Sequence, residues 1–271
     1  MKVFLVPNYY KQEAVESGLM LELWLSRQGY EVVWAADQRS KIQSAPDVDD
    51  ADLVITLGGD GTLLKAGLDC VHYGKPVLGV NLGRTGFLAT CEVEEMPEKL
   101  RLLAEGRYTL DPRGLLLARS ANGWQAEAIN DVVLFGRTRM HPMDYKVYCD
   151  GCFVSSYRSD GLILATPTGS TAYSYSAGGP IVEPEAKNII ITPICAHEIG
   201  SRCIVASDKR VVSVEQVLNA RRNAYLSVDG GRAVRLNMGD VATIRKSHLE
   251  TRLVRLKERS FYDVVSSKFS K

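Results

Sequence analysis

The pattern of apolar and polar residues in the first hundred positions alternates between that of strands and that of helices. Short, nearly continuous apolar runs predict strands over residues 2–6, 30–34, 52–57 and 76–80. Apolar residues at helical spacing predict helices over residues 14–28 and 63–73. Strands and helices that alternate in this order indicate an α/β domain built on a parallel sheet.

The pattern changes between residues 106 and 114, where helical spacing gives way to short alternating strands separated by glycine turns. These strands are predicted over residues 115–119, 127–135, 144–148, 153–157, 162–165, 210–217, 224–228 and 241–246. A short helix is predicted over residues 170–177, and residues 261–265 are typical of a helix that returns to the first domain. The second half is therefore predicted to be mostly β and sandwich-like.

The length of 271 residues fits two domains with ordinary hydrophobic cores. We predict an α/β domain over residues 1–111, completed by residues 251–271, and a β-rich domain over residues 112–250.

Composition narrows the range of partners. Thirty-three Lys and Arg against thirty-two Asp and Glu leave a net charge of +1, so no bulk field attracts nucleic acid or an anionic membrane. No apolar run approaches the roughly 20 residues of a membrane span, and the apolar start stops at Pro7, short of a signal peptide. We expect a soluble cytoplasmic protein.

Two of the six cysteines, Cys149 and Cys152, have the spacing found in zinc and redox sites. The residues between them, Asp150 and Gly151, are a strong signal for a two-residue hairpin turn. Cysteines that flank such a turn face each other across the hairpin, and no second close pair completes a set of four ligands. We therefore favour a hairpin over a metal site, with free thiols in a reducing compartment.

A glycine-rich loop, Gly58-Gly59-Asp60-Gly61-Thr62, follows the apolar strand that ends at Leu57 and precedes a predicted helix. Open α/β sheets bind ligands at such carboxyl ends, where the helix start offers N–H groups to phosphate. A carboxylate in this loop would repel phosphate, so we expect Asp60 to bind Mg²⁺ or to accept a proton from an attacking hydroxyl. The alternative is a plain tight turn in which Asp60 only caps the helix.

A second loop, residues 81–88, follows the next strand and is expected beside the first at the same edge of the sheet. Arg84 can pair with a phosphate there, and Phe87 can stack on a base. An ordinary turn with Phe87 in the hydrophobic core is the alternative that the residues leave open.

Residues 166–176 are dense in hydroxyl groups, which are costly to bury unless each finds a partner. The predicted helix start near Ser170 offers backbone donors for a phosphate, and Tyr173 offers an aromatic face for a base. The polar pair Asn130-Asp131 interrupts an apolar strand. Taken singly, such features are more often capped turns or sheet edges, and it is their joint presence that favours a ligand site.

Read in order, these motifs resemble those of the NAD kinases. The resemblance rests on the loop Gly58-Gly59-Asp60-Gly61-Thr62, the pair Asn130-Asp131, and the run from Asp160-Gly161 through Thr166-Pro167-Thr168-Gly169-Ser170-Thr171-Ala172-Tyr173 to Gly178-Gly179-Pro180. Lipid kinases and phosphofructokinases carry similar glycine–aspartate loops, whereas residues 166–173 are far more particular to NAD kinases.

The resemblance implies transfer of the γ-phosphoryl group of ATP to the 2′-hydroxyl of the adenosine ribose of NAD, giving NADP. Asp60 would accept the proton of that hydroxyl, and Mg²⁺ would arrive on the phosphates of ATP. A homotetramer or homodimer with subunit contacts near the substrate pocket is also implied. The phosphate donor would be held by Gly58, Gly59, Gly61, Thr62 and Arg84. The candidate NAD site comprises Asp60, Gly61, Phe87, Asn130, Asp131, Arg158, Asp160, Thr168, Thr171, Ala172, Tyr173, Ser174, Tyr175 and Ser176.

Three positions depart from the family pattern. Asp131 stands where many members have Glu, and Thr85 stands where the second loop usually has Leu. A Gln often found after an Asp-Gly or Asp-Ser pair is absent at Asp229-Gly230-Gly231, which leaves substrate contacts from this turn open.

Two other functions share part of the pattern. A lipid or sugar kinase with the same glycine–aspartate loop would need an apolar groove for a lipid, which the polar residues 166–176 argue against. A non-catalytic dinucleotide-binding protein would bind NAD without turnover.

Overall fold

The computed structural model describes residues 1–36, 48–83, 86–89, 91–136, 142–198, 200–217, 223–237, 239–256 and 260–269. The chain divides into two compact units: unit 1 is Met1–Arg113 with Leu249–Lys271, and unit 2 is Gly114–His248. Two strands, β6 (Thr109–Arg119) and β17 (Val241–Arg255), run from one unit into the other.

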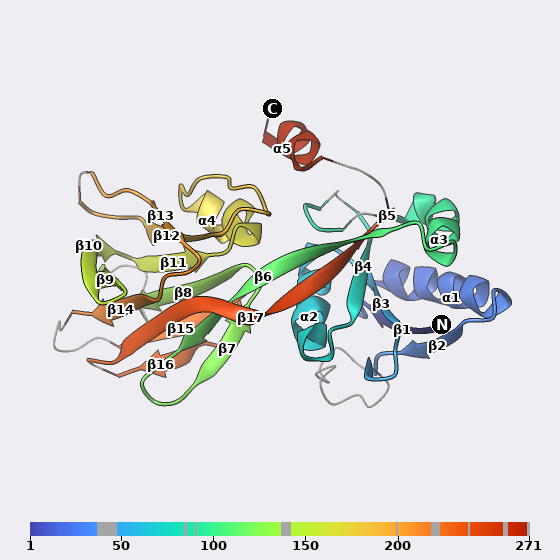
Figure 1. Cartoon of the computed structure of the whole chain (residues 1–271), viewed down its shortest axis with the longest axis horizontal. Coiled ribbons are helices and arrows are strands. Elements are labelled where there is room, and N and C mark those ends of the chain that lie inside the picture. Colours follow the sequence, from blue (N-terminus) through green and yellow to red (C-terminus); the bar gives the residue numbers. More distant parts are fainter. Residues whose placement is uncertain are drawn as a thin grey trace. The chain divides into compact units, whose positions relative to one another are not determined.

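Unit 1 contains a parallel sheet in the order β17–β4–β3–β1–β2, and β5 also pairs with β4 (Figure 1). Its other strands are β1 (Lys2–Pro7), β2 (Glu31–Trp34), β3 (Leu53–Gly58), β4 (Pro76–Asn81) and β5 (Cys91–Glu92). Its helices are α1 (Gln12–Arg27), α2 (Asp60–Cys70), α3 (Met96–Ala104) and α5 (Phe261–Phe269), with short 3₁₀ turns η3 (Val71–Tyr73) and η4 (Val93–Glu95).

Helices cover both faces of this sheet because neighbouring strand residues point to opposite sides. Leu5 and Ile55 pack in one core cluster with Leu21 of α1 and Leu100 of α3. The next strand residues, such as Phe4 and Val54, pack in a second cluster with Leu63 and Ala66 of α2. Since both faces are covered, β3 is buried along its whole length, as its continuous apolar sequence predicts.

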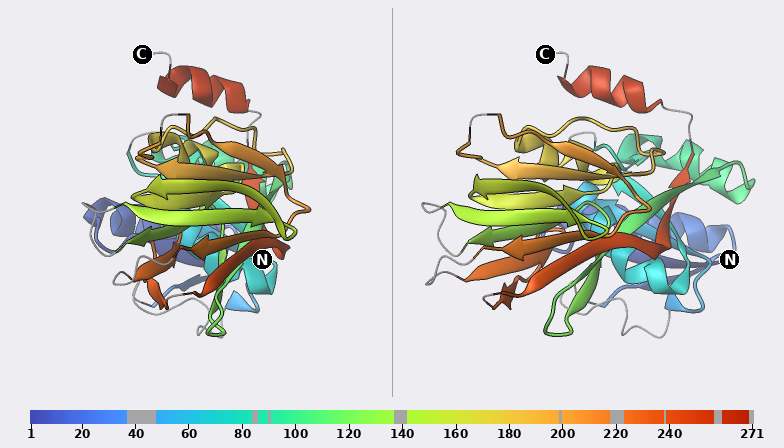
Figure 2. Two further views of the ribbon diagram at one scale, coloured as in Figure 1. Left: turned by 90° about the vertical axis from the view of Figure 1, so that its left-hand side faces the viewer. Right: turned by 60° about the vertical axis from the view of Figure 1, so that its left-hand side comes forward.

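Unit 2 consists of two sheets (Figures 1 and 2). One has the order β13–β12–β11–β8–β15–β16, and the other includes β10–β9–β14–β17 and the pair β6–β7. These strands are β7 (Gln125–Ala128), β8 (Asp131–Gly136), β9 (Met143–Cys149), β10 (Cys152–Ser159), β11 (Gly161–Ala165), β12 (Asn188–Ile194), β13 (Ile204–Ser207), β14 (Val212–Gln216), β15 (Ala224–Val228) and β16 (Val234–Leu236). A 3₁₀ turn, η5 (Thr168–Thr171), and the short helix α4 (Tyr173–Ser176) follow β11.

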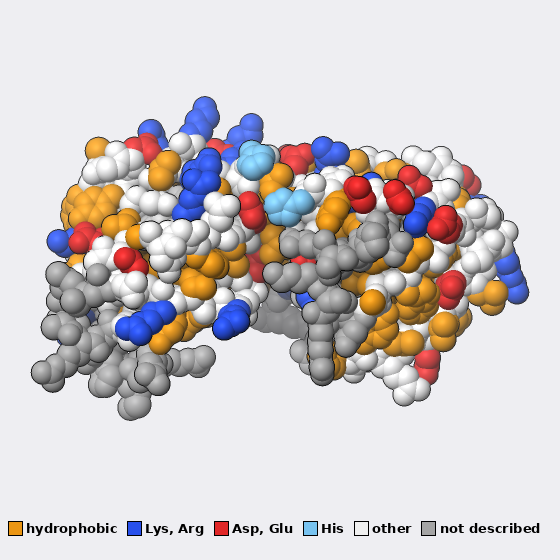
Figure 3. Space-filling model, turned by 90° about the horizontal axis from the view of Figure 1, so that it is seen from below, with side chains coloured by type: hydrophobic (Ala, Val, Ile, Leu, Met, Phe, Trp, Pro, Cys, Tyr) orange, Lys and Arg blue, Asp and Glu red, His pale blue; other side chains and the backbone are white. Residues whose placement is uncertain are grey.

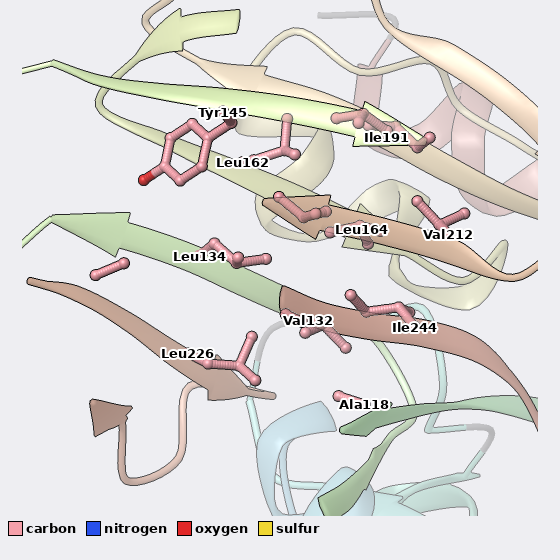
Figure 4. Close-up of a cluster of buried hydrophobic side chains, with 14 of the residues drawn as sticks. Ala118, Val132, Leu134, Tyr145, Leu162, Leu164, Ile191, Val212, Leu226 and Ile244 are labelled. Atoms are coloured by element: carbon pink, nitrogen blue, oxygen red, sulfur yellow. The ribbon is translucent and has the colours of Figure 1, made fainter. Parts of the chain in front are cut away.

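Side chains from both sheets meet in one core, which makes unit 2 a sandwich. Figure 4 shows Leu134 and Leu164 of one sheet pointing toward Val212 and Ile244 of the other. The alternate residues of the first sheet form a smaller cluster on its opposite face, with Ile163 and the segment after β11. The predicted hairpin is confirmed, because Cys149 and Cys152 pair across a turn in which both central residues have positive φ.

None of the described helices is long and apolar enough to cross a membrane. The face of the molecule drawn in Figure 3 carries side chains of both charge signs, in keeping with the balanced composition.

Candidate active site

The glycine-rich loop lies where β3 ends and α2 begins. Gly59 is extended and forms the N-cap of α2, so the helix starts at Asp60, three residues earlier than the sequence predicts. The carbonyl of Gly59 accepts the N–H groups of Thr62 and Leu63 at 3.0 and 3.2 Å. A helix start leaves its first N–H groups without intrahelical partners, so the loop presents donors to an anion.

A cavity of about 370 Å³ opens at this helix start. It is lined by residues 6–11 after β1, by Gly59, Gly61, Thr62 and Lys65, and by Ala35, Ala66 and Asp69. From β1 the chain passes through α1 to β2, which lies next to β1 toward one edge of the sheet. From β3 it passes through α2 to β4, which lies next to β3 toward the other edge. The cavity therefore lies at the point where the strand order reverses, the usual ligand site of an open α/β sheet.

Two lysines add positive charge to the cavity wall. Lys65 lies one turn into α2, and Lys11 precedes α1 and donates a hydrogen bond to the carbonyl of Leu82 at 3.4 Å. Together with the start of α2, they suit a ligand that carries several phosphates. Sequence reasoning missed residues 8–11 and Lys65, although the position of the first strand next to β3 would have pointed to them.

The Asp60 side chain is turned toward the second loop, and Asp60 is not among the described residues that line the cavity. Its Oδ2 accepts the N–H of Phe87 at 2.7 Å, and its Oδ1 accepts those of Leu88 and Ala89 at 3.2 and 3.1 Å. A Cβ on Gly86 would lie 2.0 Å from Oδ1, so this approach requires glycine. These bonds use three of about four lone-pair positions of the carboxylate and fix its orientation.

Phe87 is half-buried against the core cluster that includes α2. Its ring stacks on Phe269 of α5 with ring centres 5.7 Å apart, and Lys268 Nζ lies 4.2 Å from its centre. A base that stacks on the same face of the Phe87 ring would compete with Phe269 of α5. Arg84, the other residue predicted in this loop, lies outside the described residues.

An ion-pair cluster supports the second loop. Arg255, at the end of β17, donates to the carbonyl of Leu88 at 3.3 Å and pairs with Asp111 at 2.7 Å. Asp111 also pairs with Arg113 at 2.7 Å. Burial alone would raise the pKa of Asp111, but the hydrogen bonds and charges of the two arginines outweigh it and lower that pKa.

In unit 2, Asn130 and Asp131 lie at the start of β8. Asn130 is half-buried, and Asp131 is 5% exposed. Burial, followed by the charge of Asp229, raises the pKa of Asp131 to about 7. A buried carboxylate whose pKa is raised in this way is a typical mark of a functional site.

The predicted residues after β11 divide into buried and exposed side chains. Thr168 and Ser174 are buried, and Ser174 Oγ shares a hydrogen bond of 2.8 Å with Thr192. Tyr173 and Tyr175 are 46% and 39% exposed. The remaining predicted residues, Thr171, Ala172 and Ser176, are half-buried or exposed, and Gly169 packs so closely that a Cβ would lie 2.0 Å from the carbonyl oxygen of Asn130.

Arg158 and Asp160 lie apart from these residues. They precede β11, whereas Thr166 follows it, and the five residues of a strand span about 17 Å. Ala165 at the far end of β11 pairs with Asp131, but Gly161 pairs with Phe135. The structure therefore brings Asn130, Asp131 and the segment after β11 together, and leaves Arg158 and Asp160 at the other end of the strand.

Two family models match the chain. The model of the ATP-NAD kinase N-terminal domain matches residues 42–108, and that of the ATP-NAD kinase C-terminal domain matches residues 129–256. Together they cover more than half of the chain. The chain belongs to the NAD kinase family.

Members of the NAD kinase family match the chain along its length. An NAD kinase from Acetivibrio thermocellus is 36% identical over 279 residues, which cover 99% of this chain and 96% of that protein. One from Carboxydothermus hydrogenoformans is 38% identical over 221 residues, covering 80% and 79%.

Solved structures of kinases share the fold. An NAD kinase from Archaeoglobus fulgidus in complex with ATP is 26% identical with a TM-score of 0.80, covering 99% of this chain and 98% of that one. Yeast NADH kinase complexed with NADH is 23% identical with a TM-score of 0.86, covering 100% and 88%. The predicted fold class, an α/β part with a parallel sheet and a mostly-β sandwich, is confirmed.

Proposed function

We propose that this chain transfers the γ-phosphoryl group of ATP to the 2′-hydroxyl of the adenosine ribose of NAD, giving NADP. The observation that carries the proposal is that two kinds of group lie on different sides of the loop of residues 58–62. Backbone donors and two lysines face a cavity on one side, and a fixed carboxylate, Asp60, faces the second loop on the other. Phosphate and carboxylate are thus held by different groups of one loop, which allows the attacking hydroxyl to lie between them.

The cavity at the start of α2 is the site for the phosphate donor. Gly59 and Gly61 supply backbone N–H groups, Thr62 lines the cavity beside them, Gly58 permits the turn, and Lys65 and Lys11 balance the phosphate charge. The same groups would hold the phosphates of ATP with their bound Mg²⁺, which would supply neutralisation of the charge that develops in the transition state. No residue of this chain is assigned to the metal ion.

Asp60 accepts the proton of the attacking hydroxyl. A sugar hydroxyl is a weak nucleophile, so alignment and a nearby proton acceptor contribute most to the rate. The three backbone hydrogen bonds hold the carboxylate in one orientation and leave one lone-pair position on Oδ2 for that proton.

The acceptor NAD is held by Asn130, Asp131 and the exposed part of the segment after β11, where Tyr173 and Tyr175 offer aromatic faces. Arg158 and Asp160 reach an NAD site from a second copy of the chain, since they lie at the opposite end of β11. The proposal includes a homo-oligomer, a dimer or a tetramer, that acts in the cytoplasm.

The test is direct. The purified chain is incubated with NAD and Mg-ATP, and NADP is measured with a dehydrogenase that is specific for it. Formation of NADP in proportion to enzyme supports the proposal, and NAD binding without NADP formation would contradict it. A lipid or sugar acceptor offered in place of NAD serves as the control for acceptor specificity.

A further inference from the structure

Among the residues that the structure describes, the backbone of residues 129–131 forms hydrogen bonds with two others, Asp229 and Thr166. All three of its N–H groups donate to the carboxylate of Asp229: Ile129 to Oδ2 at 2.7 Å, and Asn130 and Asp131 to Oδ1 at 2.8 and 3.0 Å. Three hydrogen bonds to one ionised group are stronger than the same number to neutral acceptors.

The three carbonyl groups of the same segment also all accept hydrogen bonds. Thr166 donates its hydroxyl to the carbonyl of Ile129 and its N–H to that of Asn130 at 2.9 Å. Asp229 donates its own N–H to the carbonyl of Asp131 at 3.0 Å. Every backbone polar group of the segment therefore has a partner, and Asp229 supplies four of the six bonds.

The side chains of this segment differ from its backbone, because hydrogen bonds to other described residues do not hold them. No hydrogen bond or ion pair joins the side chain of Asn130 or Asp131 to another described residue, although Asp131 is only 5% exposed. A buried polar side chain without a partner is costly to the fold, and sites that bind polar ligands accept that cost. The segment thus combines a fixed backbone with side chains available to a ligand.

We propose that Asp229 is a positioning residue for the acceptor nucleotide: its carboxylate fixes the backbone of residues 129–131 so that the side chains of Asn130 and Asp131 meet NAD in one orientation. The inference rests on the proposed function, in which these two side chains bind NAD. Asp229 acts through the backbone and does not touch the reacting atoms.

The turn that carries Asp229 is shaped for this role. Asp229 has φ 45° and Gly230 has φ 68°, and the carbonyl of Val228 accepts the N–H of Gly231 at 2.8 Å. Aspartate tolerates this left-handed backbone better than most residues and reaches back to neighbouring N–H groups. Position 231 is Gly, where family members often have Gln. This is compatible with the role proposed for Asp229, which acts through the backbone of residues 129–131 and needs no side chain at position 231.

The decisive variant is Asp229→Asn, which keeps the size and the left-handed backbone. The amide oxygen can replace Oδ1, but the amide nitrogen then faces a donor, the N–H of Ile129. Asp150→Asn is the matched control, because Asp150 also opens an Asp-Gly turn with φ 50° and also accepts a backbone N–H, that of Val211.

We expect Asp229→Asn to raise the KM for NAD about tenfold, the effect of leaving one buried donor unpaired, with the KM for ATP changed by less than about twofold. NAD binding measured by calorimetry falls by the same factor, and Asp150→Asn leaves both constants unchanged. A folded Asp229→Asn protein with a wild-type KM for NAD, or with both KM values raised equally, would overturn the inference.

If Asp229→Asn does not fold, Thr166→Val tests the same segment, since it removes the hydroxyl that binds the carbonyl of Ile129. It should raise the KM for NAD selectively, and a wild-type KM would refute the inference. Failure of the proposed function is a separate result, because it is seen as absence of NADP formation by the wild-type protein.

Discussion

Asp60 illustrates how a single residue depends on contacts that are distant in the sequence. Its place between a buried strand and a helix follows from the local pattern, and so does the expectation that its carboxylate binds Mg²⁺ or accepts a proton. Its partners at positions 87–89 could not be predicted, because they lie 27 to 29 residues away and are fixed by the pairing of β3 with β4. The need for glycine at position 86 could not be predicted either, because it depends on where the Asp60 carboxylate lies.

Asp60→Asn is expected to lower turnover by about 10²–10⁴-fold, the usual contribution of a general base, while the Kd for ATP stays the same. The ATP affinity is unaffected because Asp60 does not line the described cavity. NADP formation and calorimetric ATP binding are the two measurements. A turnover close to that of the wild type would remove Asp60 from the chemistry.

Asp131 makes stability depend on pH. Its pKa is about 7 in the folded protein against an ordinary 3.8, so the folded state binds the proton more tightly than the unfolded state does. The free energy of unfolding therefore falls as the pH rises from about 4 to about 7 and is constant above that. For a difference of about three pKa units, the fall is at most about 4 kcal/mol.

Asp131→Asn removes this dependence. The Tm of the variant minus that of the wild type should increase between pH 4 and pH 7 and then level off. Thermal unfolding at a series of pH values measures the difference. A difference that is independent of pH would mean that Asp131 is not buried as a titrating carboxyl group.

At the scale of elements, apolar strands such as β3 and the alternating strands β9 and β10 were predicted, but some strand ends and some whole elements were not. β3 and β11 are buried on both faces, so their sequences are apolar throughout. β17 was predicted only over 241–246, although it extends to Arg255, because charged residues such as Arg252 break its apolar pattern where it pairs with β4. β12 and α3 were missed entirely.

The helix α5 bears on the role of Phe87. If Phe87 stacks on a base of NAD, the contact with Phe269 competes with it, and Phe269→Ala should lower the KM for NAD a few-fold, since ring stacking contributes about 0.5–1.5 kcal/mol. Tyr262→Ala is the matched control, because Tyr262 lies on the same helix and packs on Phe261 instead. Equal effects of both substitutions would show that the Phe269 ring is not the competitor.

At the scale of the whole molecule, the position of Asp160 bears on assembly. Asp160 and Asp131 lie at opposite ends of β11, and under the proposed function they contact the same NAD from two copies of the chain. The motif runs continuously through both ends of the strand, so its sequence alone does not predict that its two ends serve different copies.

Co-expression of two inactive variants tests the shared site. In mixed dimers of Asp60→Asn and Asp160→Asn chains, one of the two sites has both residues intact. About a quarter of wild-type activity should therefore return in a random mixture. No recovery, with mixed oligomers demonstrated by two affinity tags, would place both residues in one copy.

The path of the chain through its two units also sets an order of events during synthesis. Unit 2 is one continuous segment, whereas unit 1 is completed by residues 249–271, which bring the strand beside β4 and the helix that contacts Phe87. As the ribosome releases the chain from its N-terminus, the sandwich has all its strands first, and unit 1 must wait for residues 249–271 to emerge. A messenger truncated near its end would thus yield a complete sandwich beside an unfinished kinase.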